Sequence, residues 1–521
     1  MEIKGTPVKL YKNLFIVSCS ALALAGCGSD DISSPGTGGN VTINNPSTPT
    51  TPTTPTDPNA GKVTAASGCP TINDPQGLKD DGTITGPTGT WRVCTLPARI
   101  NKSVTLPKIS GLLYQLGGRV NVGTDGGFTK TSADTNVTLT IEPGVILFGG
   151  TGVSWLAVNR GNKINAVGTA TKPIIFTSRD NVLGLNTETS QGQWGGVVLM
   201  GRAKVTDCTT GSTAANTCER QTEGAADPAL FGGNDNADNS GQMSYVQIRY
   251  SGYVLGSDKE LQSLTTEGVG SGTVLDHIMS YNSSDDGAEF FGGNVNMKYY
   301  VAVGADDDSL DADTGITGNF QYGLLIQRDG AGDALMEIDS NGFESDLPRQ
   351  TLKISNFTMI QRQVSSNSEA NDLASILIRG NSDVTLANSV IYTPNNECIR
   401  LNGSGATPTT LTARSVVMSC NAAKYLGSGS YNAAATSTQF GSGANNNNDA
   451  FTSTLSGFIN GASELAVAAF DATGLGAFFA KPSNIGAVKD SNDTWYTGWT
   501  CNSSAANLGS SNTSCTSLPT T

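Results

Sequence analysis

The feature that most constrains this chain is a short apolar strand that recurs through its middle. Residues 274–281 are echoed 21 residues later by residues 295–302, and again by residues 320–327, and acidic residues follow each copy. Strands this short, separated by a few turn residues, leave no room for the helical crossovers of an ordinary parallel sheet. Stacked coils avoid this difficulty, because each coil then pairs with its neighbours.

A period of about 20 to 25 residues with short strands is typical of a parallel β-helix. We therefore expect an all-β, right-handed parallel β-helix solenoid with disulfide-stapled caps and a short C-terminal helical segment. The 63 glycines and the low charged fraction of 15% agree with many strands joined by tight turns. A β-sandwich is the alternative, but it predicts antiparallel hairpins and gives no reason for a 21-residue period.

The N-terminus has the pattern of a secretory signal peptide. Lys4, Lys9 and Lys12 precede a short apolar run, which ends in Leu-Ala-Gly-Cys at Cys27. The run is shorter than the roughly 20 apolar residues of a membrane-spanning helix. Its ending resembles the lipobox of bacterial lipoproteins, whose cysteine is acylated after cleavage. An ordinary secreted protein cleaved nearby is the alternative.

The lipobox resemblance implies a lipid anchor, with palmitate-type acyl chains on Cys27 as the contact with the membrane. Gly28, rather than an aspartate, follows the cysteine, and by the same resemblance this favours the outer membrane, at its cell-surface or periplasmic face. The predicted organisation is a signal peptide at 1–26, a disordered Pro/Ser/Thr/Gly tether at 27–62, an N-terminal cap at 63–130, the β-helix at 131–430, and a C-terminal cap at 431–521 with a helix within 455–470.

Charge and cysteine content narrow the chemistry further. The net charge of −14 argues against nucleic acid as a partner and favours cations. A single histidine, His277, excludes zinc enzymes that need two or three imidazoles. Eight cysteines remain after the signal peptide and Cys27, and an even number outside the cytoplasm suggests disulfides. Their clustering favours nearest-neighbour pairs among the many possible pairings: Cys69 with Cys94, Cys208 with Cys218, Cys398 with Cys420, and Cys501 with Cys515.

The densest chemistry in the chain is a set of acidic residues that follow the repeated strands. If the period holds, these carboxylates lie above one another on adjacent coils, about 4.8 Å apart. Such a ladder either raises the pKa values of its members or binds a cation, and Ca²⁺ suits a site with many oxygen ligands. Carboxylates that only cap turns are the alternative. The candidate metal ligands are Asp285, Asp286, Glu289, Asp306, Asp307, Asp308, Asp311 and Asp313.

Several segments are similar to a poorly characterised family of bacterial surface lipoproteins with a right-handed parallel β-helix. The resemblance spans roughly residues 130–500 and implies fold and surface location, without an established activity. It rests on Ile141-Glu142-Pro143-Gly144, Gln193-Trp194-Gly195-Gly196, the stretch 285–293 and Ile485-Gly486-Ala487-Val488.

Two functions remain open at this point. The first is a binding or adhesion module for a glycan or a partner surface protein, stabilised by Ca²⁺. The second is a polysaccharide lyase or hydrolase that uses the acidic turns, with Arg249, Lys298 or Arg328 as a basic partner. No residue is assigned as catalytic, because fold alone does not imply function.

Overall fold

The computed structural model describes residues 61–256, 259–340, 345–365, 374–405 and 407–520. The predicted signal peptide, Cys27 and nearly all of the 27–62 tether lie outside the described residues. No helix within the described part of the chain is long and apolar enough to cross a membrane.

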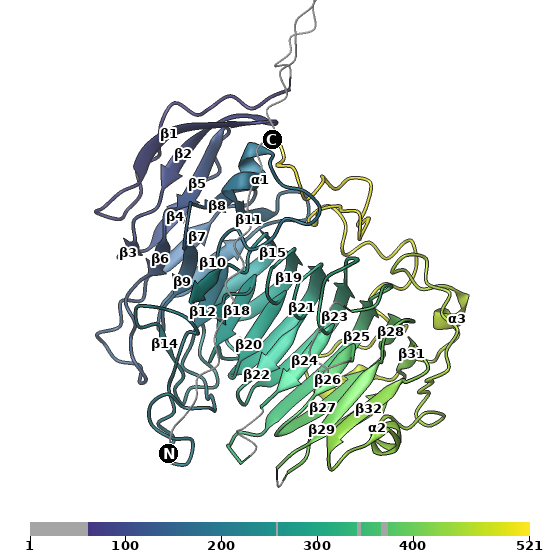
Figure 1. Cartoon of the computed structure of the whole chain (residues 1–521). Helices are drawn as coiled ribbons and strands as arrows, with labels where there is room; N and C mark the ends of the chain where they lie inside the picture. Colours follow the sequence, from purple (N-terminus) through teal and green to yellow (C-terminus); the bar gives the residue numbers. More distant parts are fainter. Residues whose placement is uncertain (1–60, 257–258, 341–344, 366–373, 406, 521) are drawn as a thin grey trace, which may run out of the picture. The chain divides into compact units, whose positions relative to one another are not determined.

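Parallel strands stack in successive coils, as the repeat predicted (Figure 1). One ladder, on an outer face of the coils, is an 11-stranded parallel sheet. Its strands are β3 (Arg99–Ile100), β6 (Arg119–Val122), β9 (Trp155–Val158), β12 (Val197–Met200), β18 (Leu264–Glu267), β20 (Ala288–Phe291), β22 (Asp311–Asp313), β24 (Met336–Asp339), β26 (Ile376–Ile378), β29 (Ile399–Gly403) and β32 (Tyr425–Gly429).

The other two ladders are joined into a 17-stranded sheet, because five long strands run through both of them. These are β15 (Gly241–Arg249), β19 (Val274–Tyr281), β21 (Asn294–Val303), β23 (Thr317–Ile326) and β25 (Gln350–Ile360). The first ladder also contains β4 (Val104–Leu106), β7 (Thr138–Ile141), β10 (Lys163–Val167), β27 (Ser382–Ala387) and β30 (Thr410–Arg414). The second also contains β2 (Gly89–Thr95), β5 (Leu112–Leu116), β8 (Ile146–Gly149), β11 (Ile174–Ser178), β28 (Val390–Thr393) and β31 (Val417–Cys420).

Each long strand bends at one residue in the left-handed backbone conformation. These residues are Tyr245, His277, Tyr299, Tyr322 and Asn356, with φ between 49° and 65°. They occupy the same place in successive coils, so the rings of the first four stack at centroid separations of 4.3, 4.4 and 5.1 Å. Left-handed backbone is unfavourable for such residues, and ring stacking offsets part of that cost.

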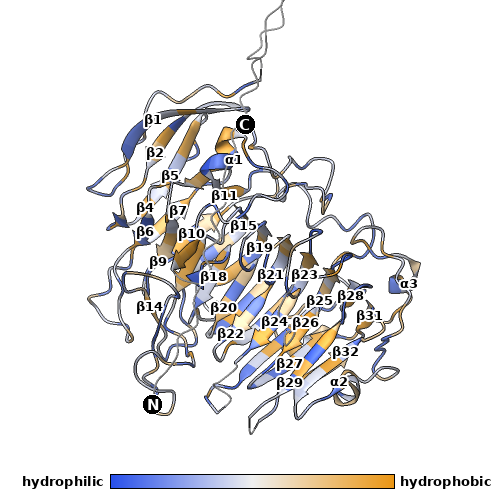
Figure 2. Ribbon diagram, viewed as in Figure 1, coloured by the Kyte–Doolittle hydropathy of each residue, from blue (hydrophilic) through white to orange (hydrophobic). Residues whose placement is uncertain are grey.

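The core is a set of side-chain columns inside the coils. One column runs through Met243, Leu275, Met297, Phe320 and Ile354, which are at most 3% exposed and face one another in register. Hydrophobic and hydrophilic residues alternate along β22, β24 and β29 of the 11-stranded sheet (Figure 2). One set of side chains therefore fills the core, and the other faces outward.

The repeat between β19 and β21 is 22 residues, one more than the 21 predicted. Leu275 pairs with Met297, whereas the sequence had aligned Val274 with Val295. Val274 is 46% exposed and Val295 is 1% exposed, so these two valines face opposite sides. A shift of one residue turns every side chain of a strand to the other face, and core packing selects the 22-residue register.

Both ends of the stack are covered. The strand β1 (Lys79–Gly86) pairs antiparallel with β2 at one end. Parallel stacking already begins at β2, inside the segment 63–130 that the sequence assigned to a cap. At the other end α2 (Ala433–Phe440) packs on the last coil, where Phe440 contacts Tyr425 at a ring separation of 5.9 Å.

The helix predicted within 455–470 was wrong in extent. The structure has only the four-residue α3 (Ala462–Leu465), followed by a 3₁₀ turn at Ala472–Leu475. The buried carboxylate of Glu464 accepts hydrogen bonds from the backbone N–H groups of Thr454 and Gly461. These bonds fold the segment into a tight loop, so a longer helix does not form.

The remaining C-terminal residues run back along the coils toward the N-terminal end (Figure 1). The Asn388 side chain bonds the backbone N–H and C=O of Phe470 at 2.7 and 3.0 Å. Farther on, the fully buried Arg249 donates to the backbone carbonyls of Cys515 and Ser517, both at 2.9 Å. The tail is thus held by polar side chains that project from the coils.

The structure confirms the four nearest-neighbour disulfides. They join Cys69 to Cys94, Cys208 to Cys218, Cys398 to Cys420, and Cys501 to Cys515. The third links neighbouring coils across 22 residues, and the fourth closes the C-terminal tail. A small α1 (Arg179–Leu183) and the short strand pairs β13 (Arg220–Gln221) with β14 (Leu230–Phe231) and β16 (Val254–Gly256) with β17 (Lys259–Glu260) complete the elements.

Candidate functional site

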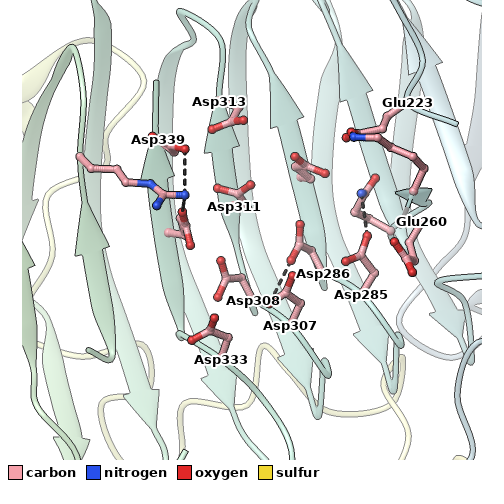
Figure 3. A pocket seen from close by; sticks show the side chains of 15 residues that line it. Glu223, Glu260, Asp285, Asp286, Asp307, Asp308, Asp311, Asp313, Asp333 and Asp339 are labelled. Atoms are coloured by element: carbon pink, nitrogen blue, oxygen red, sulfur yellow. Dashed lines mark hydrogen bonds and ion pairs between the residues drawn. The ribbon is translucent and has the colours of Figure 1, made fainter. Parts of the chain in front are cut away.

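A groove of about 330 Å³ lies on the outer face of the 11-stranded sheet, over β20, β22 and β24 (Figure 3). Its charged lining consists of twelve carboxylates and two cations. The carboxylates are Glu223, Glu260, Asp285, Asp286, Glu289, Asp307, Asp308, Asp311, Asp313, Asp333, Glu337 and Asp339, and the cations are Lys259 and Arg379.

Strand register places three of these carboxylates in one row. Glu289 pairs with Asp311, and Asp311 pairs with Glu337, on three adjacent coils. The residue between the two aspartates of β22, Ala312, is fully buried in the core. Because side chains alternate along a strand, Asp311 and Asp313 both face the groove. The pairing of Asp313 with Asp339 begins a second row beside the first.

The turns that precede these strands supply further carboxylates. The carboxylate of Asp286 accepts the backbone N–H of Asp308 at 2.9 Å, and that of Asp308 accepts the N–H of Ala334 at 2.7 Å. These bonds join each coil to the next. One carboxylate oxygen of Asp286 and one of Asp308 therefore stabilise turns, as the alternative interpretation of these residues predicted. Gln262 donates to Asp285 at 2.9 Å on the same side of the groove.

The two cations that line the groove bond carboxylates toward its opposite ends. Arg379 bonds Glu337 at 2.7 Å and Asp339 at 3.0 Å (Figure 3). Lys259 forms an ion pair with Glu223. Between these ends lie the residues of the central cluster: Asp285, Asp286, Glu289, Asp307, Asp308, Asp311 and Asp313.

Burial and mutual repulsion raise the pKa values of the central carboxyls. Burial comes first for Asp285, where it raises the pKa to about 7 with a further contribution from Asp307. For Asp286, Glu289, Asp308, Asp311 and Asp313, burial and then the neighbouring carboxylates raise the pKa well above its usual range. Burial also raises the pKa of Glu337 to about 8, although Arg379 opposes the shift. These carboxyls therefore need either protons or a cation at neutral pH.

Two sets of three carboxylates are close enough to share an ion. One is Asp285, Asp286 and Asp307, and the other is Asp286, Glu289 and Asp311. Within each set, one oxygen from every residue lies within 4.8 Å of the others. Asp286 belongs to both sets and is only 5% exposed.

Seven of the eight predicted metal-ligand candidates line this groove, and Asp306 does not. Asp306 instead accepts a hydrogen bond from Gln191 at 2.5 Å and lies 3.5 Å from Arg328. It directly precedes Asp307, so chain neighbours at this turn point to different surroundings. The groove residues that the sequence interpretation missed are Glu223, Lys259, Glu260, Gln262, Asp333, Glu337 and Arg379. Asp339 opens an acidic turn that the sequence had suggested as another cation or sugar contact, with a solvated loop as the favoured alternative.

The basic residues considered as catalytic partners lie elsewhere. Arg249 is buried against the C-terminal tail. Lys298 lies 4.7 Å from the centre of the Phe478 ring, and Arg328 lies beside Asp306. None of the three lines the groove. Arg379 does line the groove, and it bonds Glu337 and Asp339 at the ends of the two carboxylate rows.

Stacked parallel coils with an acidic groove on one outer sheet define this protein as a parallel β-helix protein. The family model of the pectate-lyase like beta helix domain matches residues 127–500. The match covers well over half of the chain, so the protein belongs to that family. Comparison with curated proteins and with solved structures gave no match.

Proposed function

We propose that this protein is a binding module whose acidic groove takes up Ca²⁺ and uses it to hold a glycan or a partner surface protein. The family fits either a binding role or a role in acting on polysaccharides. The observation that carries the binding proposal is the geometry of the two carboxylate triads around Asp286.

Calcium binds its oxygen ligands at about 2.3–2.6 Å. Two ligands of one ion therefore lie at most about 5 Å apart. The 4.8 Å limit within each triad agrees with this requirement. Carboxylates that flank a glycosidic bond in hydrolases are separated by roughly 5–9.5 Å, so the triads favour a shared cation over an acid pair.

Unsatisfied oxygen atoms support the same proposal. Oδ1 of Asp313 is buried and has no hydrogen-bond partner among the described residues. Glu289 and Asp311 are close enough to share a hydrogen bond, which two ionised carboxylates cannot form. A divalent ion removes both costs at once, because it neutralises the repulsion and coordinates the free oxygens.

The cation also explains how such a groove can receive a ligand. Ca²⁺ accepts six to eight oxygen ligands, and a triad fills only part of that shell. Sugar hydroxyls or carbonyl and carboxylate oxygens of a partner protein complete it. In the same proposal, acylation of Cys27 anchors the protein to the outer membrane, and the 27–62 tether separates the β-helix from the lipid.

Calorimetric titration of the full chain with CaCl₂ tests the cation site. Asp286→Asn removes a charge from both triads while keeping an oxygen that can accept the Asp308 N–H. We expect this substitution to weaken calcium binding at least about tenfold. Asp306→Asn is the matched control. It removes the same charge from the corresponding turn of the next coil, at a residue that does not line the groove. Equal affinities for the two variants would refute the proposed site.

A polysaccharide-active enzyme is the second candidate, favoured by the family and by two carboxyls with pKa values near neutrality. These are Asp285, at about 7, and Glu337, at about 8, within the range useful for proton transfer. Assays for new reducing ends and for unsaturated products, over a panel of neutral and acidic polysaccharides, separate the two roles. Turnover that Glu337→Gln abolishes would favour the enzyme, and saturable binding without turnover would favour the binding module.

A further inference from the structure

A second cavity, independent of the acidic groove, lies between the first coils and the C-terminal tail. Its volume is about 420 Å³, within the roughly 300–1,000 Å³ range of small-molecule sites. The coil wall comes from the turns around Lys108, Gly144 and Lys172. The opposite wall is formed by tail residues that include Thr500 and Thr513. The disulfide between Cys501 and Cys515 closes this part of the tail.

Two lysines from neighbouring turns line this cavity with a gap between them. Gly144 lies between their side chains: a Cβ atom built there would be 3.6 Å from Cβ of Lys172 and 3.8 Å from Cδ of Lys108. The backbone of Gly144 has a φ of 83°, which disfavours any other residue at this place. The turn therefore leaves room beside the aliphatic parts of the two lysine side chains.

Neither lysine ammonium forms an ion pair within the described ranges, where Lys79, Lys259, Lys424 and Lys481 do. The carboxylate of Glu142 accepts the backbone N–H of Lys108 at 2.8 Å. Lys108 is partly buried, and its pKa is lowered by that burial and then by the positive charge of Lys172. Two cations in proximity repel each other, as the lowered pKa of Lys108 indicates. An anion placed between them would remove the repulsion.

The rest of the lining suits a hydroxylated ligand body. Thr171, Ser511 and Thr513 provide hydroxyl groups on both walls, and Pro173 and Ile175 provide apolar surface. Sugars present hydroxyls and apolar C–H faces together, so both kinds of lining can be used. A lone inorganic anion would leave the apolar part of the cavity unfilled.

We propose that this cavity binds a sugar that carries an oxyanion, with the phosphate or carboxylate between Lys108 and Lys172 and the ring against Pro173 and Ile175. Phosphate and carboxylate share the recognition chemistry, because each accepts charge-assisted hydrogen bonds from ammonium groups. This cavity shares no lining residue with the acidic groove. The proposal therefore holds whether or not the acidic groove binds calcium.

The test is calorimetric titration of the full chain with four probes: glucose 6-phosphate, glucuronate, glucose and inorganic phosphate. We expect one or both anionic sugars to bind at least about tenfold more tightly than glucose. Lys108→Met and Lys172→Met should each weaken that binding about tenfold, because each removes one charged hydrogen bond. Lys130→Met is the matched control, since Lys130 is exposed and does not line the cavity.

Three outcomes would overturn the proposal. The first is no binding of either anionic sugar up to about 10 mM. The second is equal loss in the control and in both cavity variants. The third is inorganic phosphate binding as tightly as glucose 6-phosphate, which would remove the sugar from the assignment. Unchanged melting temperatures of the three variants establish that a loss of binding does not reflect unfolding.

Discussion

Removal of divalent cations should make the stability of this protein fall as the pH rises from about 5 to 8. Asp285 illustrates the reason, because its pKa is raised from 3.8 to about 7 in the folded protein. A carboxyl with a raised folded-state pKa stabilises the fold below its unfolded pKa, and this contribution is lost as the pH rises through the folded value. About two pKa units of this shift lie between pH 5 and pH 8, so at about 1.4 kcal/mol per unit Asp285 alone corresponds to a loss on the order of 3 kcal/mol over this range. The more deeply buried carboxyls shift in the same direction.

Calcium should reverse this trend, because it binds the ionised carboxylates that form at higher pH. An ion at one hundred times its dissociation constant adds about 2.7 kcal/mol. For a chain of this length, 1 kcal/mol corresponds to a melting-temperature change on the order of 1 °C. We therefore expect the melting temperature in EDTA to fall by roughly 3 °C or more between pH 5 and pH 8, with most of the loss restored in calcium.

Thermal melts of the full chain at several pH values, in EDTA and in CaCl₂, measure this effect. Asp285→Asn should flatten the pH dependence in EDTA, because the amide cannot ionise. Asp306→Asn should leave it unchanged, since Asp306 lies outside the groove. Two results would contradict this coupling between groove ionisation and calcium: a melting temperature that rises with pH in EDTA, or one that is the same with and without calcium at pH 8.

Three further predictions concern residues outside the groove. Arg249→Met should cost about 3 kcal/mol and expose the tail to proteolysis, because it removes the charged donor of the Cys515 and Ser517 carbonyls; an unchanged digestion pattern would contradict this role. Serine at both Cys398 and Cys420 should lower the free energy of unfolding by about 3 kcal/mol, as expected for a 22-residue loop, and denaturant titration checks the loss. Burial raises the pKa of Glu267 to about 8, so Glu267→Gln should stabilise the protein by an amount that grows from about pH 5 to 8; a constant effect across this range would argue that the carboxyl stays ionised.

The architecture was predictable because packing of the core requires the same pattern of apolar residues in every coil. Columns such as Leu275, Met297 and Phe320 need apolar residues at the same place in each coil, and this leaves a visible period in the sequence. The exact register was less visible, since both Val274 and Val295 are apolar although only Val295 is buried. The disulfides followed from the clustering of the cysteines in the sequence. Two pairs are about one coil apart, at 25 and 22 residues, and the other two are closer, at 10 and 14 residues.

The composition of the groove was predictable only where the coils have equal length. Asp286 and Asp308 are 22 residues apart, and so are Glu289 and Asp311. The predicted 21-residue period therefore brought the acidic turns together but aligned their residues one position too early. Glu337 lies 26 residues beyond its partner Asp311, because the turn between these coils is longer. The Glu337-x-Asp339 pattern repeats Asp311-x-Asp313 and was the available signal. Arg379 and Glu223 come from longer excursions of the chain, for which the sequence contains no comparable pattern.

The central claim is that the carboxylates around Asp286 hold a cation. Crystals grown in millimolar calcium, with diffraction recorded for anomalous scattering, test it most directly. If Ca²⁺ binds there, we expect an anomalous peak within about 2.3–2.6 Å of oxygens from Asp286 and at least two other groove carboxylates. Groove carboxyls that bond only to one another and to water, with no anomalous peak at that calcium concentration, would contradict it.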